Sequence, residues 1–187
     1  MSTFEIVAAV FGIISVFFSS RQNVLAWPTS LINNAMYFAF FLDQRLFALM
    51  ALQAFFGGIA IYGWYKWLFG GADRTPLRVT RIPPGLAVRL GLVAVVGTAA
   101  IWFALEHHTE DPDPLIDAAF FSVSLTAQWM MARKYFECWP VWVAVNCVAL
   151  PFFLVRGNYP TAGQYGVFLV LAIMGTRGWW RAVGSNQ

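Results

Sequence analysis

Carboxamide side chains are the polar groups that lie inside the long apolar stretches of this sequence. Asn34 ends a pattern, W-P-x-x-x-x-x-N, that begins at Trp27. Asn146 ends a second copy that begins at Trp139. An amide stranded in hydrocarbon is costly, so each must face a hydrogen-bond partner, water or a ligand. The full set within apolar stretches is Asn33, Asn34, Gln53, Gln128, Asn146 and Gln164.

Aromatic side chains share a helix face with these amides. In each copy the tryptophan and the asparagine are seven residues apart, which is two helical turns and therefore one face. Tyr37 extends this stripe in the first copy, and Trp142 lies on it in the second. Indole rings stack on flat heteroaromatic molecules and attract cationic ones. Amides donate and accept hydrogen bonds to carboxamide or sugar hydroxyl groups. The pattern favours a site for a planar, polar solute.

The two copies belong to a longer duplication with an offset of 112 residues. The same offset relates two arginines, two glycines and a further pair of tryptophans. Gln53 corresponds to Gln164 if a one-residue slip is allowed. An internal repeat of this kind brings equivalent side chains to a shared centre. The pairs at the common offset are Arg21 with Arg133, Gly63 with Gly175 and Trp67 with Trp179.

Both residue types also have a structural interpretation. Amides in membrane helices often form hydrogen bonds to neighbouring helices, and each such bond stabilises the fold by about 0.6 to 2 kcal/mol. Tryptophans at the ends of membrane helices are typical of the interfacial aromatic belt. We assign Trp64, Trp67, Trp179 and Trp180 to such a belt, and Trp27 and Trp139 fit it in part.

Ionisable residues are missing from the middle of every apolar stretch. Asp117, for example, lies near a predicted helix end, and both histidines lie in a polar connector. Ion coupling usually needs an intramembrane carboxylate, and acid–base or covalent catalysis needs a nucleophile with a partner. We therefore expect neither an enzyme nor an ion-coupled pump, and no cofactor. Cys138 and Cys147 fit no metal motif. A ring cation would be held by aromatic faces alone.

Composition and length place these residues in a membrane protein. The 187 residues are 59% hydrophobic and only 11% charged, about half the charged fraction of a soluble domain. Seven apolar stretches are long enough to predict transmembrane helices. The first has no basic residue before it, so we expect it to be retained rather than cleaved as a signal peptide. The predicted spans are 4–19, 27–42, 46–68, 85–105, 115–132, 138–155 and 161–180.

Basic residues predict the orientation. With seven spans, ten lysines and arginines fall on the side of the C-terminus, and only Arg45 and Arg156 fall on the other. The positive-inside rule then predicts an external N-terminus and a cytoplasmic C-terminus.

The repeat predicts the architecture. Residues 1–69 form a first three-helix unit, 70–114 a linker containing the fourth helix, and 115–187 a second three-helix unit. Equivalent helices are four crossings apart, so both units have the same orientation. Such parallel repeats are a known transporter plan, with the substrate at the interface between repeats.

The order and spacing of these residues resemble the PnuC-type vitamin transporters over all but residues 70–114. The resemblance implies a SWEET-like fold of three, one and three helices, and facilitated diffusion of nicotinamide riboside. It further implies a homotrimer in the bacterial inner membrane and trapping of the solute by a cytoplasmic kinase. The motifs are Arg21-Gln22-Asn23, Trp27-Pro28, Arg45-Leu46-Phe47, Leu52-Gln53, Tyr62-Gly63-Trp64-Tyr65-Lys66-Trp67, Gln128-Trp129, Arg133-Lys134, Glu137-Cys138-Trp139, Thr161-Ala162 and Gly175 with Trp179.

The resemblance also implies a set of substrate-binding residues. The chain departs from relatives at Phe47 and Leu49, where they often have a tyrosine and an acid, and at Gln164, where they have leucine. Other members carry thiamine or riboflavin, so these remain alternatives, as does a membrane scaffold that transports nothing. The expected substrate contacts are Trp27, Asn34, Tyr37, Gln53, Gln128, Trp139, Trp142, Asn146 and Gln164.

Overall fold

A computed structural model describes residues 3–45, 47–109 and 112–184 of the chain. Within these ranges the chain forms seven α-helices and one short 3-10 helix, which confirms the all-helical prediction. Every predicted span corresponds to one helix, with ends that differ by up to four residues. The helices are α1 (Thr3–Ser20), α2 (Ala26–Asp43), α3 (Phe47–Phe69), α4 (Pro84–His108), α5 (Pro114–Ala132), α6 (Cys138–Val155) and α7 (Tyr159–Gly184), with the 3-10 turn η1 (Ala72–Arg74) between α3 and α4.

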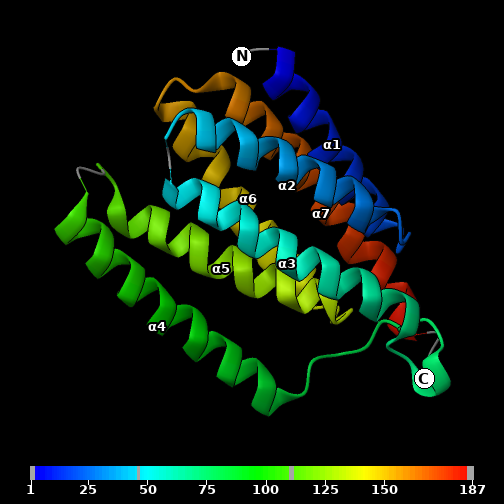
Figure 1. Cartoon of the computed structure of the whole chain (residues 1–187). Helices are drawn as coiled ribbons and strands as arrows, with labels where there is room; N and C mark the ends of the chain where they lie inside the picture. The colour runs from blue at the N-terminus through cyan, green and yellow to red at the C-terminus, as the bar shows by residue number, and fades with distance from the viewer. Residues whose placement is uncertain (1–2, 46, 110–111, 185–187) are drawn as a thin grey trace.

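Six of the helices form a closed ring. Each packs on two neighbours in the order α1, α2, α3, α5, α6, α7 and back to α1. Helix α4 lies outside this ring and packs along α5 (Figure 1). Helices α1 to α3 therefore meet α5 to α7 at two seams, α3 against α5 and α7 against α1.

Local sequence explains where the helices begin and turn. Pro84 and Pro114 open α4 and α5, where a missing backbone N–H costs nothing. Pro28 and Pro140 lie in the first turn of α2 and α6, so they are not hinges within longer helices.

By length and composition alone, three of the described helices are apolar enough to cross a membrane: α4, α5 and α6. A shorter apolar stretch covers Ile6–Ser20 in α1. Amides and hydroxyl groups lower the hydropathy of α2 and α7, because these helices turn polar faces towards the centre of the ring. The external face of α4 is strongly apolar, with Val88, Val95 and Val96 each 64–67% exposed.

Four tryptophans form a buried group, the indole cluster, near the end of the bundle where α7 ends. It consists of Trp27, Trp67, Trp139 and Trp179, none more than 3% exposed. The ring centroids of Trp67 and Trp179 are 5.9 Å apart. Trp27 packs edge-on against Trp67, and Trp139 against Trp179, at 5.2 and 5.6 Å. The assignment of Trp67 and Trp179 to an interfacial belt was wrong, whereas the exposure of Trp64 (37%) and Trp180 (54%) suits a belt.

Close-packed glycines explain the burial of Trp27 and Trp139, and hydrogen bonds explain that of Trp67 and Trp179. Gly63 faces the ring of Trp27, and Gly175 faces that of Trp139, so closely that a methyl group at either position would overlap the indole. The Nε1 atom of Trp67 donates to the Met131 carbonyl across one seam, at 3.1 Å. Across the other seam, Trp179 Nε1 donates to the Ser19 carbonyl, also at 3.1 Å.

The connector between α3 and α4 lies across the turn between α5 and α6. We call residues 75–83 of this connector the strap. Thr80 N–H donates to the Lys134 carbonyl at 3.1 Å, and Phe136 N–H donates back to the Thr80 carbonyl at 3.0 Å. Ile82 N–H donates to the carboxylate of Glu137 at 3.0 Å. The strap therefore covers the same end of the bundle as the indole cluster.

Lys134 is buried between the strap and the indole cluster. Its ammonium group donates to the Leu77 carbonyl at 2.8 Å and lies 4.5 Å from the ring centre of Trp67. Burial lowers the pKa of Lys134 to about 8, because removal from water disfavours the charged form. The carbonyl and the indole face offset part of that cost.

Replacement of Gly63 or Gly175 by alanine should destabilise the protein. The added methyl group would force Trp27 or Trp139 out of its packed position, and overpacking of this kind costs about 1–3 kcal/mol. We expect Tm in detergent to fall by about 3–10 °C. Gly58→Ala, on the same helix as Gly63 with no atom within 4 Å of the added carbon, is the matched control and should leave Tm unchanged or slightly higher. Equal effects of Gly63→Ala and Gly58→Ala would contradict this account.

Candidate functional site

The ring of helices encloses a cavity of about 790 Å³, within the range of small-molecule sites. Every α-helix contributes at least one lining residue. Most of the lining is apolar or aromatic, and the polar remainder consists mainly of amides and hydroxyl groups. Such a surface suits a solute with both a flat apolar face and hydrogen-bonding groups.

Seven of the nine expected substrate contacts line this cavity. They come from five helices and from both seams of the ring. Two residues, Trp27 and Trp139, do not line it. The residues brought together are Asn34, Tyr37, Gln53, Gln128, Trp142, Asn146 and Gln164.

Trp27 and Trp139 lie instead in the indole cluster, where each is 1% exposed. Each lies in the first turn of its helix, two turns before the cavity-lining asparagine. The close approach of Gly63 and Gly175 draws the two rings away from the cavity and against α3 and α7. Their expected role as substrate contacts is therefore not supported by this geometry.

Two buried donors at the cavity wall are available for a ligand. The Nδ2 atom of Asn34 and the Nε1 atom of Trp142 are buried, and neither has a hydrogen-bond partner among the described residues. Buried donors of this kind are normally satisfied. Because both residues line the cavity, an acceptor in the cavity is the natural partner. The amide of Asn146 is held in place by its bond to the Trp142 carbonyl at 2.7 Å.

Asn33 behaves differently from its neighbour Asn34. Its Nδ2 atom donates to the Ala8 carbonyl of α1 at 2.7 Å, beside Gly12, which lets the two helices approach. The interpretation of amides as joints between helices therefore applies to Asn33.

The one-residue slip proposed between Gln53 and Gln164 is wrong. Helices α3 and α7 begin 112 residues apart and run without interruption to Trp67 and Trp179, which have the same offset. At the common offset of 112 residues, Gln53 corresponds to Tyr165 rather than to Gln164. All three of these side chains, Gln53, Gln164 and Tyr165, still line the cavity, because adjacent positions at this depth both reach it.

The two ends of the cavity differ. Towards the end where α7 finishes, its lining includes Ser19 and Met131, whose carbonyls accept the indole hydrogen bonds of the cluster. The indole cluster therefore closes the cavity at this end. At the opposite end the lining includes Thr109 and Asp117, which are exposed.

Asp117 is a cavity-lining residue that sequence reasoning missed. Its position near a helix end led to the expectation that no acid would face the solute. The available signal was spacing, since Asp117, Ser124 and Gln128 are seven and four residues apart and so share one face of α5. All three line the cavity.

A helical ring around an amide-lined cavity, set among helices apolar enough to span a bilayer, is typical of a multi-pass membrane protein that binds a small molecule. The family model described as nicotinamide mononucleotide transporter matches residues 2–181. The chain therefore belongs to this transporter family.

Individual relatives agree with the family match and confirm the PnuC-type resemblance. The nicotinamide riboside transporter PnuC of Escherichia coli is 26% identical, over 96% of this chain and 85% of the relative. The riboflavin/roseoflavin transporter RibM of Streptomyces davaonensis is also 26% identical, over 94% of this chain and 84% of the relative. A crystal structure of the vitamin B3 transporter PnuC superposes with a TM-score of 0.75 at 23% identity, covering 97% of this chain and 82% of that one. At that identity the superposition shows the fold alone.

Neighbouring asparagines provide a test of the two roles for amides. Asn33→Ala should lower Tm by the equivalent of about 0.6–2 kcal/mol, because it removes a bond between α1 and α2. Asn34→Ala should leave Tm of the ligand-free protein nearly unchanged, since its Nδ2 atom has no partner among the described residues. Thermal unfolding in detergent measures both. A larger loss of Tm for Asn34→Ala than for Asn33→Ala would assign both amides to helix packing.

Proposed function

We propose that this chain transports nicotinamide riboside, an NAD precursor, across the bacterial inner membrane. The observation that carries the proposal is the pair of buried donors, Asn34 Nδ2 and Trp142 Nε1, at the wall of one cavity. A nicotinamide ring has a flat face for the indole and a carboxamide oxygen for a donor. Ribose hydroxyl groups suit the remaining amides. The name of the Escherichia coli relative supports this substrate.

The alternative is a related vitamin. The RibM relative is named for riboflavin and roseoflavin, and thiamine shares the flat heteroaromatic ring. Each of these solutes would use the same stacking surface and amides.

Two like-oriented three-helix units would perform the transport. Residues 1–69 form one unit, 115–187 the other, and the linker 70–114 carries α4, as in a SWEET-like arrangement of three, one and three helices. Matching features support this division. Helices α2 and α6 have bounds 112 residues apart, and the Trp67 and Trp179 hydrogen bonds join residues with that same offset. Rocking of one unit against the other would expose the cavity to each side in turn.

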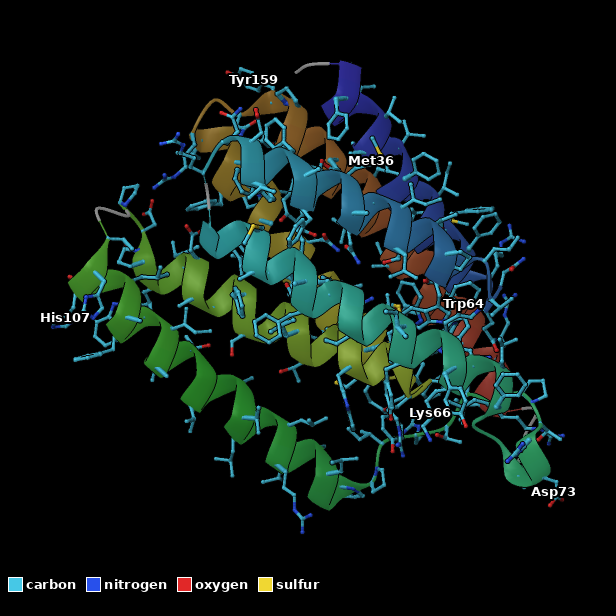
Figure 2. All side chains as sticks on the ribbon, viewed as in Figure 1. Met36, Trp64, Lys66, Asp73, His107 and Tyr159 are labelled. Carbon is cyan, nitrogen blue, oxygen red and sulfur yellow. The ribbon has the colours of Figure 1, made fainter. Side chains whose placement is uncertain are left out.

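The orientation proposed from loop charge fits this arrangement. Figure 2 shows Lys66 and Asp73 at one end of the bundle and His107 and Tyr159 at the opposite end. The end with Lys66 also holds the strap and most of the basic residues, which favours a cytoplasmic location. The indole cluster then closes the cavity on the cytoplasmic side, and the N-terminus lies outside.

Facilitated diffusion is the proposed mode of transport. Deep in the cavity the described lining is neutral, and its acid, Asp117, lies at the exposed end. The described lining therefore holds no deep carboxylate of the kind that proton or sodium coupling usually needs. A cytoplasmic kinase would make uptake directional by phosphorylating the solute. We also propose a homotrimer, in which the exposed valines of α4 contact lipid or a neighbouring copy.

A vitamin panel tests the substrate. Nicotinamide riboside at about 100 times Kd should stabilise the purified protein by about 2.7 kcal/mol, a rise in Tm of several degrees. Trp142→Ala should weaken this binding about tenfold or more, through loss of ring stacking, while Trp64→Ala, a tryptophan outside the cavity, should not. Calorimetry with nicotinamide riboside, thiamine and riboflavin measures the affinities. A response to none of the three would favour a scaffold, and a response only to riboflavin or thiamine would change the substrate.

A liposome assay tests the mode of transport. Uptake of labelled nicotinamide riboside should equilibrate, and an imposed pH or sodium gradient should not change its final level. Accumulation above the external concentration, driven by either gradient, would show ion coupling and overturn the uniport proposal. Trp142→Ala liposomes serve as the control for leakage.

A further inference from the structure

One carboxylate lies at the exposed end of an otherwise neutral cavity. Asp117 is in the first turn of α5 and its side chain is exposed. Among the described residues that line the cavity, it alone carries a formal charge at neutral pH. A solute that enters from this end passes its carboxylate before it reaches the amides of Asn34 and Asn146.

Aromatic side chains surround the same part of the path. Tyr165 stacks on Phe153, with ring centroids 5.3 Å apart and an angle of 8° between the planes. Phe168 meets Tyr165 edge-on at 6.3 Å, and all three rings line the cavity. Ring faces attract cations, so the aromatic lining and the carboxylate favour the same sign of charge.

Basic groups near this entrance do not cancel that preference. Arg156, at the same end, forms an ion pair with Asp113, and its guanidinium group lies 4.6 Å from the ring centre of Phe152. The segment 106–117 contains five acidic residues and no lysine or arginine. Among the described residues at this end, the acids Asp43, Glu106, Asp113 and Asp117 outnumber the basic residues Arg45 and Arg156. This balance favours a negative potential at the entrance.

We propose that Asp117 is a specificity-determining residue that makes the cavity prefer a cationic heteroaromatic ring to a neutral ring of the same shape. This inference rests on the proposed transport of a vitamin. The pyridinium ring of nicotinamide riboside and the thiazolium ring of thiamine carry a positive charge, whereas the isoalloxazine of riboflavin is neutral. The carboxylate of Asp117 thus discriminates between cationic and neutral rings. Stacking and amide hydrogen bonds do not make that distinction.

A matched pair of ligands isolates the effect of charge. Nicotinamide riboside and its reduced dihydropyridine form have nearly the same outline, the same carboxamide and the same ribose, but only the oxidised ring is cationic. Calorimetry gives Kd for each form with wild-type protein and with Asp117→Asn. We expect the ratio of the two affinities to fall about three- to tenfold in the variant, because attraction by a carboxylate near the protein surface is of that size. The neutral form should bind both proteins equally.

Salt provides an independent measurement. Between about 0.02 and 0.5 M ionic strength the preference of the wild type for the cation should decline, because salt screens the exposed carboxylate. The preference of Asp117→Asn should not change. If Asp117→Asn fails to fold, a wild-type preference that is insensitive to salt overturns the proposal, and so does Asp117→Glu with no preference for the cation.

Asp43→Asn is the control. Asp43 ends α2 at the same end of the bundle and is exposed, but does not line the cavity. The ratio of the affinities for the cationic and neutral forms should be the same in this variant as in the wild type. If Asp43→Asn lowered that ratio as much as Asp117→Asn, the preference would come from the general surface charge and not from Asp117. If both forms bind the wild type and Asp117→Asn leaves their ratio unchanged, this inference alone is wrong. If neither form binds, the proposed substrate is wrong and the inference fails with it.

Discussion

Packing of four buried indoles holds the ring of helices closed. Trp67 and Trp179 meet at the centre of the cluster, and each also donates a hydrogen bond across a different seam. Gly63 and Gly175 make this possible, since any larger side chain would occupy the volume of a ring. One set of contacts therefore both joins α1–α3 to α5–α7 and seals one end of the cavity. Movement that opens this end must separate the same rings.

The low dielectric constant of a membrane explains where the polar groups lie. Amides and hydroxyl groups on α2 and α7 would be costly against lipid, so they face the ring interior, where neighbours or a solute satisfy them. Helix α4 faces no cavity over most of its length and is accordingly rich in exposed valine. The kind of polar group also changes with depth in the cavity. Neutral donors lie in the middle of the cavity, and a carboxylate lies at its exposed end, where hydration makes charge affordable.

Sequence reasoning succeeded where the spacing of residues placed them on one face of a helix. The amides of Asn34 and Asn146 and the ring of Trp142 share helical stripes, and all three line the cavity. It failed for Trp67 and Trp179, because a tryptophan beside basic residues at a helix end has the same local pattern whether it faces lipid or a neighbouring helix. It also paired Gln53 with Gln164 across a one-residue slip, because the two residues are of the same type. The continuous helices α3 and α7 leave no place for the extra residue that this slip requires.

Composition, periodicity and spacing by themselves determined that the chain is an all-helical membrane protein with seven helices and an amide-lined interior. These properties depend on the cost of leaving polar groups in hydrocarbon, and that cost acts on each helix separately. Tertiary structure decided which aromatic rings reach the cavity, which end is closed, and that Asp117 lines the cavity. Those properties depend on contacts between helices that are distant in sequence, such as the hydrogen bond from Trp179 in α7 to Ser19 in α1. The sequence of one helix alone does not determine such contacts.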